Sequence, residues 1–246
     1  MPTPNMTENE IISYLNKTSL PTLLVEGEDD ALIYRWLETK LGIFTGNILI
    51  CSGRSILISI YRRRDSIRCG KLAWLADLDM WRFSSPPSEL NGIIFTSGYS
   101  IENDLYAGTD VESLLESAER SQHGQLLATA CRWFAFEILE HQAGRENRCA
   151  THIKQIVDFA SMDVATVFAV QRGFKEPDSS LLARITSSYK LQLRGKTLLQ
   201  VLVVFLSASS RNPKYSCAAI IEMCLKLYPN NPYIQRIILE ARAQLA

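Results

Sequence analysis

The chain has 246 residues, of which 47% are hydrophobic and 21% charged, and its 26 basic and 26 acidic side chains give a formal net charge of zero. This composition is too apolar for a disordered chain and is ordinary for a globular protein. No run of about 18 apolar residues occurs, which excludes a transmembrane helix. The first thirty residues include Glu8, Glu10 and Glu26 and lack the pattern of a signal peptide. We therefore expect a cytoplasmic protein.

Six cysteines are scattered along the chain without a C-x-x-C pair. In a chain without a secretory pattern, this spacing indicates reduced core thiols rather than disulfides. Cys149 and His152 lie three residues apart. Without a second matched pair, they make only a weak zinc signal.

Up to about residue 106, short apolar runs alternate with amphipathic stretches. A capping box, Thr7-Glu8-Asn9-Glu10, begins the first predicted helix. The apolar runs predict strands over 21–26, 47–51, 71–76 and 92–96. The amphipathic stretches predict helices over 7–17, 29–41 and 54–64, and a further helix that begins near Ser100. This alternation favours an α/β fold in which a parallel sheet is flanked by helices on both faces.

Beyond residue 106 nearly all of the chain is predicted to be helical. Glycines and prolines separate amphipathic stretches that show no internal repeat. We expect helices near 110–120, 123–143, 150–159, 162–171, 178–190, 196–209, 214–228 and 231–245. The predicted organisation is therefore an α/β domain over 1–106 followed by an α-helical C-terminal domain over 107–246.

Acidic residues follow three of the four predicted strands. Glu26 ends the first strand, and Asp77 and Asp79 follow the third. Glu102 lies one turn into the helix after the fourth strand. In a parallel sheet these positions share the carboxyl edge, where ligands bind. Clustered carboxylates repel unless a cation or protons neutralise them, and Mg²⁺ or Mn²⁺ prefers such oxygen ligands. The pattern predicts a metal site, although D-x-D alone is also common in solvated turns.

Three motifs in this order resemble those of Toprim domains, which occur in topoisomerases, bacterial primases and overcoming-lysogenization-defect nucleases. Val25-Glu26-Gly27-Glu28-Asp29-Asp30 is similar to the V-E-G-x-x-D motif, and Asp77-Leu78-Asp79 matches the D-x-D motif. The segment that begins at Thr96 and continues through Ile101-Glu102-Asn103-Asp104-Leu105 resembles the T-x-x-x-x-I-E-N-x-L pattern of the DUF4435 group. That group of Toprim-like proteins includes nuclease subunits of PARIS anti-phage systems. The resemblance covers residues 20 to 106.

The resemblance implies a Toprim fold and phosphodiester cleavage with a divalent metal, Mg²⁺ or Mn²⁺. It implies that Glu26 is a metal ligand or proton carrier, and that Asp77 and Asp79 are metal ligands. Glu102 would complete the acidic shell. One or two ions can deprotonate the attacking water and stabilise the charge on the leaving oxygen. In PARIS systems the nuclease works with an ATPase partner and cleaves tRNA, which stops host translation.

Basic and aromatic residues offer contacts for nucleic acid. Arg54 follows the second predicted strand and could hold a scissile phosphate, or could be a solvated arginine at a helix start. Arg62 and Arg63 belong to the densest positive cluster, which is typical of phosphate contacts and of solvated helix ends alike. Trp81 and Phe83, just beyond D-x-D, could stack on bases or cap the sheet.

Two other patterns in the sequence do not meet the requirements of the functional motifs that they resemble. Gly195-Lys196-Thr197 is similar to the end of a phosphate-binding P-loop, but Lys190 stands where that motif needs glycine. We therefore predict a helix start there, and any ATP hydrolysis would come from a partner. The three histidines lack a Ser or Cys pattern for a nucleophilic triad. Trp133, Phe134 and Phe136 are predicted to lie in the core.

Two functions of different classes fit the sequence. The first is a metal-dependent endonuclease of an anti-phage defence system, which causes abortive infection by cleaving RNA, in particular tRNA, once an ATPase partner releases or activates it. The alternative is a non-cutting Toprim-fold scaffold or regulatory subunit of the ATPase assembly. Apolar segments over 201–206 and 233–239 could bind a partner or a second copy of the chain, or could pack together in a thick helical core.

Overall fold

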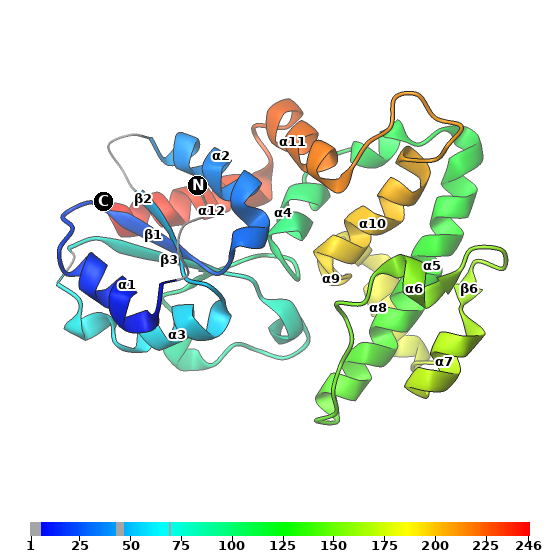
Figure 1. Ribbon diagram of the computed structural model, residues 1–246, viewed down its shortest axis with the longest axis horizontal. Coiled ribbons are helices and arrows are strands. Elements are labelled where there is room, and N and C mark those ends of the chain that lie inside the picture. The colour runs from blue at the N-terminus through cyan, green and yellow to red at the C-terminus, as the bar shows by residue number, and fades with distance from the viewer. Residues whose placement is uncertain (1–5, 43–46, 69) are drawn as a thin grey trace. The chain divides into compact units, whose positions relative to one another are not determined.

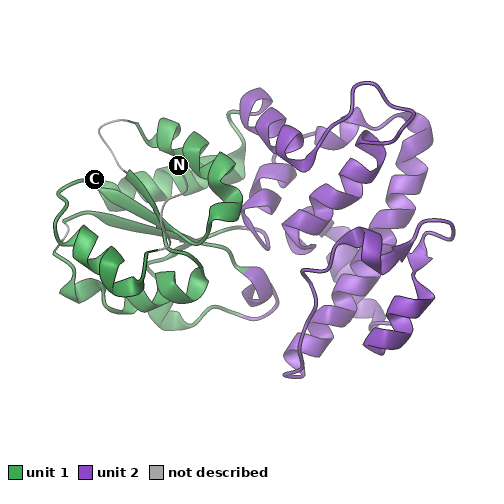
Figure 2. Cartoon of the chain, in the orientation of Figure 1, with its two compact units in different colours: residues 1–78, 85–96, 229–246 green, residues 79–84, 97–228 purple. Residues whose placement is uncertain are grey.

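The computed structural model describes residues 6–42, 47–68 and 70–246 (Figure 1). The chain divides into two compact units, which Figure 2 colours separately. Unit 1 comprises residues 1–78, 85–96 and 229–246, and unit 2 comprises residues 79–84 and 97–228. The division differs from the expected boundary at residue 106, because the last helix of the chain belongs to unit 1 and residues 97–106 belong to unit 2.

Unit 1 is built on a four-stranded parallel sheet. Its strands are β1 (Thr22–Val25), β2 (Asn47–Ile50), β3 (Leu72–Ala76) and β4 (Ile94–Phe95). They lie in the order β2-β1-β3-β4, and every neighbouring pair is parallel. The first strand is fully buried, as its continuous apolar run predicts. The α/β class and the parallel sheet are therefore confirmed.

Helices cover both faces of this sheet (Figure 1). Unit 1 contains α1 (Glu8–Leu15), α2 (Ala31–Leu41), α3 (Arg54–Arg62) and α12 (Pro232–Leu245). Helix α1 contacts α3, whereas α2 contacts α12. The predicted capping box is present, since Thr7 Oγ1 accepts the Glu10 N–H and Glu10 accepts the Thr7 N–H. Three short 3₁₀ turns, Glu28–Asp30, Arg64–Ser66 and Ser88–Leu90, complete the unit.

Unit 2 is mainly helical. Its helices are α4 (Ile101–Ala107), α5 (Ser117–Gln142), α6 (Ile153–Ile156), α7 (Thr166–Arg172), α8 (Ser179–Ser187), α9 (Tyr189–Gln192), α10 (Gly195–Leu206) and α11 (Cys217–Leu227). It also contains 3₁₀ turns over Asp79–Phe83 and Val111–Leu114. The long helix α5 packs against α8 and α10. Trp133, Phe134 and Phe136 of α5 are buried, which confirms their predicted place in the core.

Several predicted helices in this region were wrong in detail. The stretch expected as a helix over 110–120 is a 3₁₀ turn followed by the start of α5. The stretches expected as helices over 150–159 and 162–171 contain a short antiparallel ladder of β5 (Val157–Asp158) and β6 (Asp163–Val164). The Asp158 carboxylate accepts the Ala160 N–H, and Met162 adopts a positive φ of 56°. These two features turn the chain back and end the helix.

The two apolar segments pack inside their own units. Val201, Leu202, Phe205 and Leu206 of α10 are buried in unit 2. Ile234, Ile237 and Ile238 of α12 are buried in unit 1, where α12 contacts β1, β3 and β4. Leu239 is 63% exposed. Most of the apolar surface considered for a partner is therefore already covered by the chain itself.

The described cysteines are free, and four of them, Cys51, Cys131, Cys149 and Cys224, are buried. Burial raises the pKa of the Cys51 and Cys131 thiols to about 12. These side chains are therefore neutral core residues at ordinary pH, as predicted. Cys69 lies outside the described residues.

Gly195 begins α10, as predicted for the Gly-Lys-Thr segment, and packs closely against α4. A Cβ at this position would lie 2.4 Å from Ser100 Oγ and 2.9 Å from Asn103 Oδ1. We expect Gly195→Ala to lower the free energy of unfolding by about 1–3 kcal/mol, because both neighbours are themselves buried. Urea denaturation measures this change.

Gly124→Ala is the matched control. Gly124 lies inside α5, and a Cβ added there would meet no atom within 4 Å apart from the adjoining backbone of its own helix. Alanine at this position should therefore stabilise the protein by about 0.5–1 kcal/mol through helix propensity. Equal effects of the two substitutions would contradict the close packing of α10 on α4.

Candidate functional site

Glu26 and Asp77 lie side by side at the carboxyl edge of the sheet. The strands that precede them are neighbours, with Val25 opposite Leu75. The Asp77 N–H donates to Glu26 Oε1 at 2.9 Å. The Glu26 side chain is only 17% exposed. The structure thus brings together the two predicted acidic residues of unit 1.

Arg54 joins this pair. Its Nε lies 3.2 Å from Glu26 Oε1, and its Nη2 donates to the carbonyl oxygen of Asp77. The turn before α3 sets this position, because Gly53 adopts a φ of 123°, which L residues rarely adopt. The Gly53 N–H donates to the carbonyl of Glu26. The start of α3 is therefore held against the end of β1, and the guanidinium neutralises the Glu26 carboxylate.

Arg62 and Arg63 lie at the other end of α3. The helix has nine residues and is about 13 Å long. Arg62 pairs with Glu89 at 3.2 Å and Arg63 with Glu8 at 2.6 Å, and both arginines are exposed. A helix that follows a parallel strand runs back toward the opposite edge of the sheet. The structure therefore does not bring Arg62 and Arg63 to Glu26.

The backbone of the D-x-D motif is held at every residue. Besides the Asp77 N–H, the Leu78 N–H donates to Thr96 Oγ1 at 3.1 Å within unit 1. The Asp79 N–H donates to the carbonyl of Tyr99 at 2.7 Å within unit 2. Asp79 adopts a φ of 45°, which is uncommon for a residue other than glycine. The turn that presents Asp79 is thus fixed by hydrogen bonds.

The loop that holds Asp79 is itself held by α4. Asp104 accepts the N–H groups of Ser97 and Gly98, at 2.8 and 2.6 Å. Asn103 donates to the carbonyls of Lys190 and Leu193, both at 2.8 Å. Both side chains are fully buried. The sequence signal for this role was the spacing of Ser100 and Asn103, which form a capping box at the start of α4.

Glu102 lies in the interior of unit 2. It is 3% exposed, and its Oε2 accepts the Ser100 hydroxyl at 2.5 Å. Its Cβ lies against the first residue of α10, where a Cβ on Gly195 would be 2.9 Å away. This position indicates a structural role for Glu102 and does not support its predicted place in a metal shell.

The aromatic residues beyond D-x-D belong to unit 2. Phe83 meets the edge of Phe134 with ring centroids 5.8 Å apart, and the Arg184 guanidinium lies 5.4 Å from the Phe83 centroid. Trp81 is partly buried in the same 3₁₀ turn. Phe83 is therefore placed by packing against α5 within unit 2.

Across the described parts of the chain, no three His, Cys, Asp or Glu side chains come together as a metal-binding group. The donor chemistry of unit 1 nevertheless fits magnesium. Mg²⁺ commonly takes one or two protein carboxylates and completes its shell with water and substrate phosphates. Glu26 and Asp77 can supply those oxygens, but an ion would compete with Arg54 for the Glu26 carboxylate. Cys149 and His152 form no such group either.

Comparisons with known proteins add no family. No protein-family model matches the chain, and no curated protein matches it. In the described residues, no helix is both long and apolar enough to cross a membrane. The likeness to Toprim domains therefore depends on the three sequence motifs.

Asn103→Ala tests the support of Asp79. The substitution leaves two buried carbonyls without a donor, so we expect the free energy of unfolding to fall by about 2–4 kcal/mol. Urea denaturation measures it, with the exposed Asn91→Ala as a control that should change stability by less than about 0.5 kcal/mol. A loss below about 1 kcal/mol for Asn103→Ala would show that other contacts hold the loop.

Proposed function

We propose that the chain is a metal-dependent endonuclease of Toprim type that cleaves RNA, with tRNA as the substrate. The observation that carries this proposal is the placement of Glu26 and Asp77 side by side at the carboxyl edge of a parallel sheet. Asp79 follows two residues later on a turn with a fixed backbone. This is the edge at which α/β sheets bind their ligands.

In this proposal three acids share the binding of the metal ion, and Arg54 and Glu102 have other roles. Glu26, Asp77 and Asp79 would hold Mg²⁺ or Mn²⁺, which when bound supplies an acidified water and stabilises charge on the leaving oxygen. The Asp77 N–H orients the Glu26 carboxylate. Arg54 lies next to that carboxylate and would pair with a substrate phosphate once an ion takes its place at Glu26. Glu102 contributes by packing α4 against α10.

The resemblance extends the proposal to an anti-phage defence system in the cytoplasm. The nuclease would be kept inactive by an ATPase partner and released on infection. The Gly-Lys-Thr segment supports the need for a partner, since it starts a packed helix and its first residue is buried against Ser100. A homodimer fits the same proposal, because symmetric association is the commonest oligomer.

Two observations favour the alternative of a non-cutting scaffold. Arg54 already neutralises Glu26, as a guanidinium would in a Toprim-like site that has lost its metal. The absence of a three-residue metal group among the described residues points the same way. The nuclease remains the better proposal because the chain retains all three motif acids, Glu26, Asp77 and Asp79, which a non-cutting scaffold would not need.

RNA cleavage tests the proposal directly. Wild-type protein with Mg²⁺ or Mn²⁺ should cleave end-labelled tRNA, and Asp77→Ala, Asp79→Ala and Glu26→Gln should each lower the rate about 100-fold or more, because each removes a charged oxygen ligand. Glu28→Gln is the control, since Glu28 is an exposed acid two residues from Glu26 and should retain the wild-type rate. Sequencing of the RNA ends gives the cleavage position. Wild-type rates in the three site variants would contradict the assignment.

Metal binding separates the nuclease from the scaffold without relying on activity. We expect Mn²⁺ to bind wild-type protein in calorimetry and to raise its thermal midpoint. Asp77→Ala should abolish this binding. Arg54→Gln should tighten it about tenfold, because the ion no longer competes with a guanidinium for Glu26. No heat of binding in either the wild type or Arg54→Gln would favour the scaffold.

A further inference from the structure

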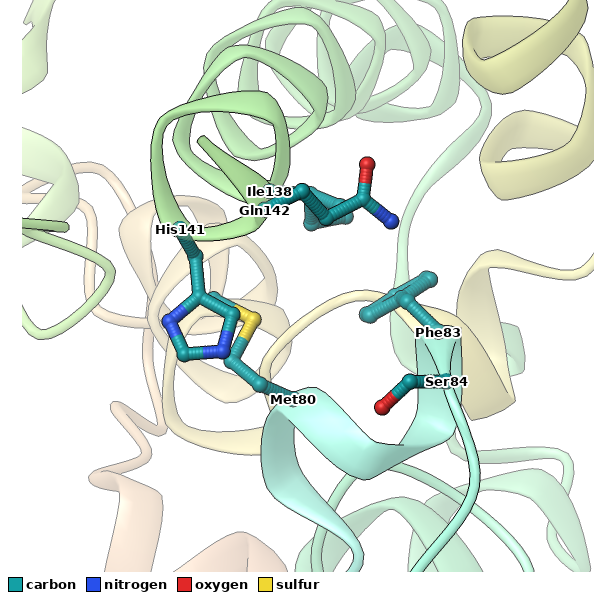
Figure 3. Close-up of a pocket in the computed structure, with 6 residues that line it drawn as sticks. All are labelled: Met80, Phe83, Ser84, Ile138, His141 and Gln142. Carbon is teal, nitrogen blue, oxygen red and sulfur yellow. The ribbon is translucent and has the colours of Figure 1, made fainter. Parts of the chain in front are cut away.

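A pocket of about 350 Å³ lies within unit 2, and its lining begins with Met80, the residue that follows Asp79 in the sequence (Figure 3). One wall is formed by Met80, Phe83 and Ser84, and the opposite wall by Ile138, His141 and Gln142 at the end of α5. The Gln142 amide points across the opening toward Phe83, and the His141 ring lies beside Met80 (Figure 3). The volume is within the range of small-molecule sites in proteins.

The lining is suited to an uncharged planar group. None of the six lining residues is an aspartate, glutamate, lysine or arginine, so the pocket offers no permanent charge to a phosphate or a metal ion. It combines an aromatic ring and a thioether with an amide, an imidazole and a hydroxyl. Aromatic side chains stack on nucleobases, and a glutamine amide can pair with the edge of a base through two hydrogen bonds.

Two of the lining side chains, Phe83 and His141, are positioned by contacts with residues outside the pocket. Phe83 makes a T-shaped contact with Phe134, and the Arg184 guanidinium lies 5.4 Å from the centroid of the Phe83 ring. Asn147 Nδ2 lies 3.3 Å from His141 Nδ1. An amide N–H that donates to this nitrogen leaves the neutral ring with its proton on Nε2, where it can serve as a donor. The rings of Phe83 and His141 therefore need little further ordering when a ligand binds.

We propose that this pocket binds an unpaired nucleobase of the RNA substrate, next to the phosphate that is cleaved. This inference rests on the proposed nuclease function and assigns the substrate a single-stranded segment. Met80 directly follows Asp79, and consecutive Cα atoms lie about 3.8 Å apart. Asp79 is a proposed ligand of the ion that acts on the scissile phosphate. A base in the pocket would therefore belong to a nucleotide close to that phosphate. Sequence-specific RNA recognition commonly uses such splayed bases from loops.

RNA binding by the full chain in a Glu26→Gln background tests the pocket without cleavage of the probe. The probe is a fluorescently labelled single-stranded RNA of eight mixed nucleotides, followed by anisotropy. Phe83→Leu and Gln142→Ala should each weaken binding about tenfold, the usual effect of losing one stacked or paired base. Gln125→Ala, which is exposed on the same helix and outside the pocket, should bind as the parent does.

Inorganic polyphosphate is the second probe, because it carries the charge of RNA without bases. It should compete for the parent protein and both pocket variants with equal affinity. Gln142 is exposed, so its substitution leaves the core intact even if Phe83→Leu perturbs the contact with Phe134.

The outcomes separate this inference from the proposed function. Unchanged RNA affinity in both pocket variants would overturn the proposal that the pocket binds a base. The proposed nuclease function would not be affected by that result, because it is tested by the cleavage rate of the wild type. An equal loss of RNA and polyphosphate binding would also overturn it, since a base would not be what the pocket recognises. A parent protein that binds no RNA, together with a wild type that cleaves none, would overturn both proposals.

Discussion

The Glu26 carboxylate is the contact on which the edge of the sheet depends. One of its oxygens accepts the Asp77 N–H and the Arg54 guanidinium, and so links the ends of β1 and β3 to the start of α3. A carboxylate that is mostly buried requires such partners, because its charge is costly to desolvate alone. A divalent ion would satisfy the same charge. The nuclease and the scaffold therefore differ in which cation Glu26 holds, and Arg54 is the residue that decides between them.

The sequence predicted the sheet well because its signals are local. Each strand is a short apolar run with a turn after it, and the Thr7 capping box is complete within four residues. The pairing of Glu26 with Asp77 followed from a general rule about parallel sheets. The return of α12 to unit 1 could not be predicted, because an amphipathic helix does not specify which apolar surface it will cover. The two-residue strands β5 and β6 are too short to show alternation.

The candidate site was predicted less well where burial decides a residue's role. Glu102 lies in the first turn of the helix that follows a strand, but it faces the interior of unit 2 with Ser100 as its partner. Sequence spacing does not distinguish a carboxylate in a packed helix from one at a sheet edge. Arg62 and Arg63 were candidates for phosphate contacts because of their charge, but a helix after a parallel strand carries its last residues away from the carboxyl edge.

The third motif gains a physical explanation from its contacts. Thr96 holds the Leu78 N–H, and the buried pair Asn103 and Asp104 shapes the loop whose Tyr99 carbonyl holds Asp79. A left-handed φ at a residue other than glycine costs free energy and persists only where the surroundings impose it. Here the surroundings are residues of the third motif. The I-E-N-D-L segment, residues 101–105, therefore acts on D-x-D by fixing the backbone at Asp79. Support of this kind is expected where the exact placement of a carboxylate matters.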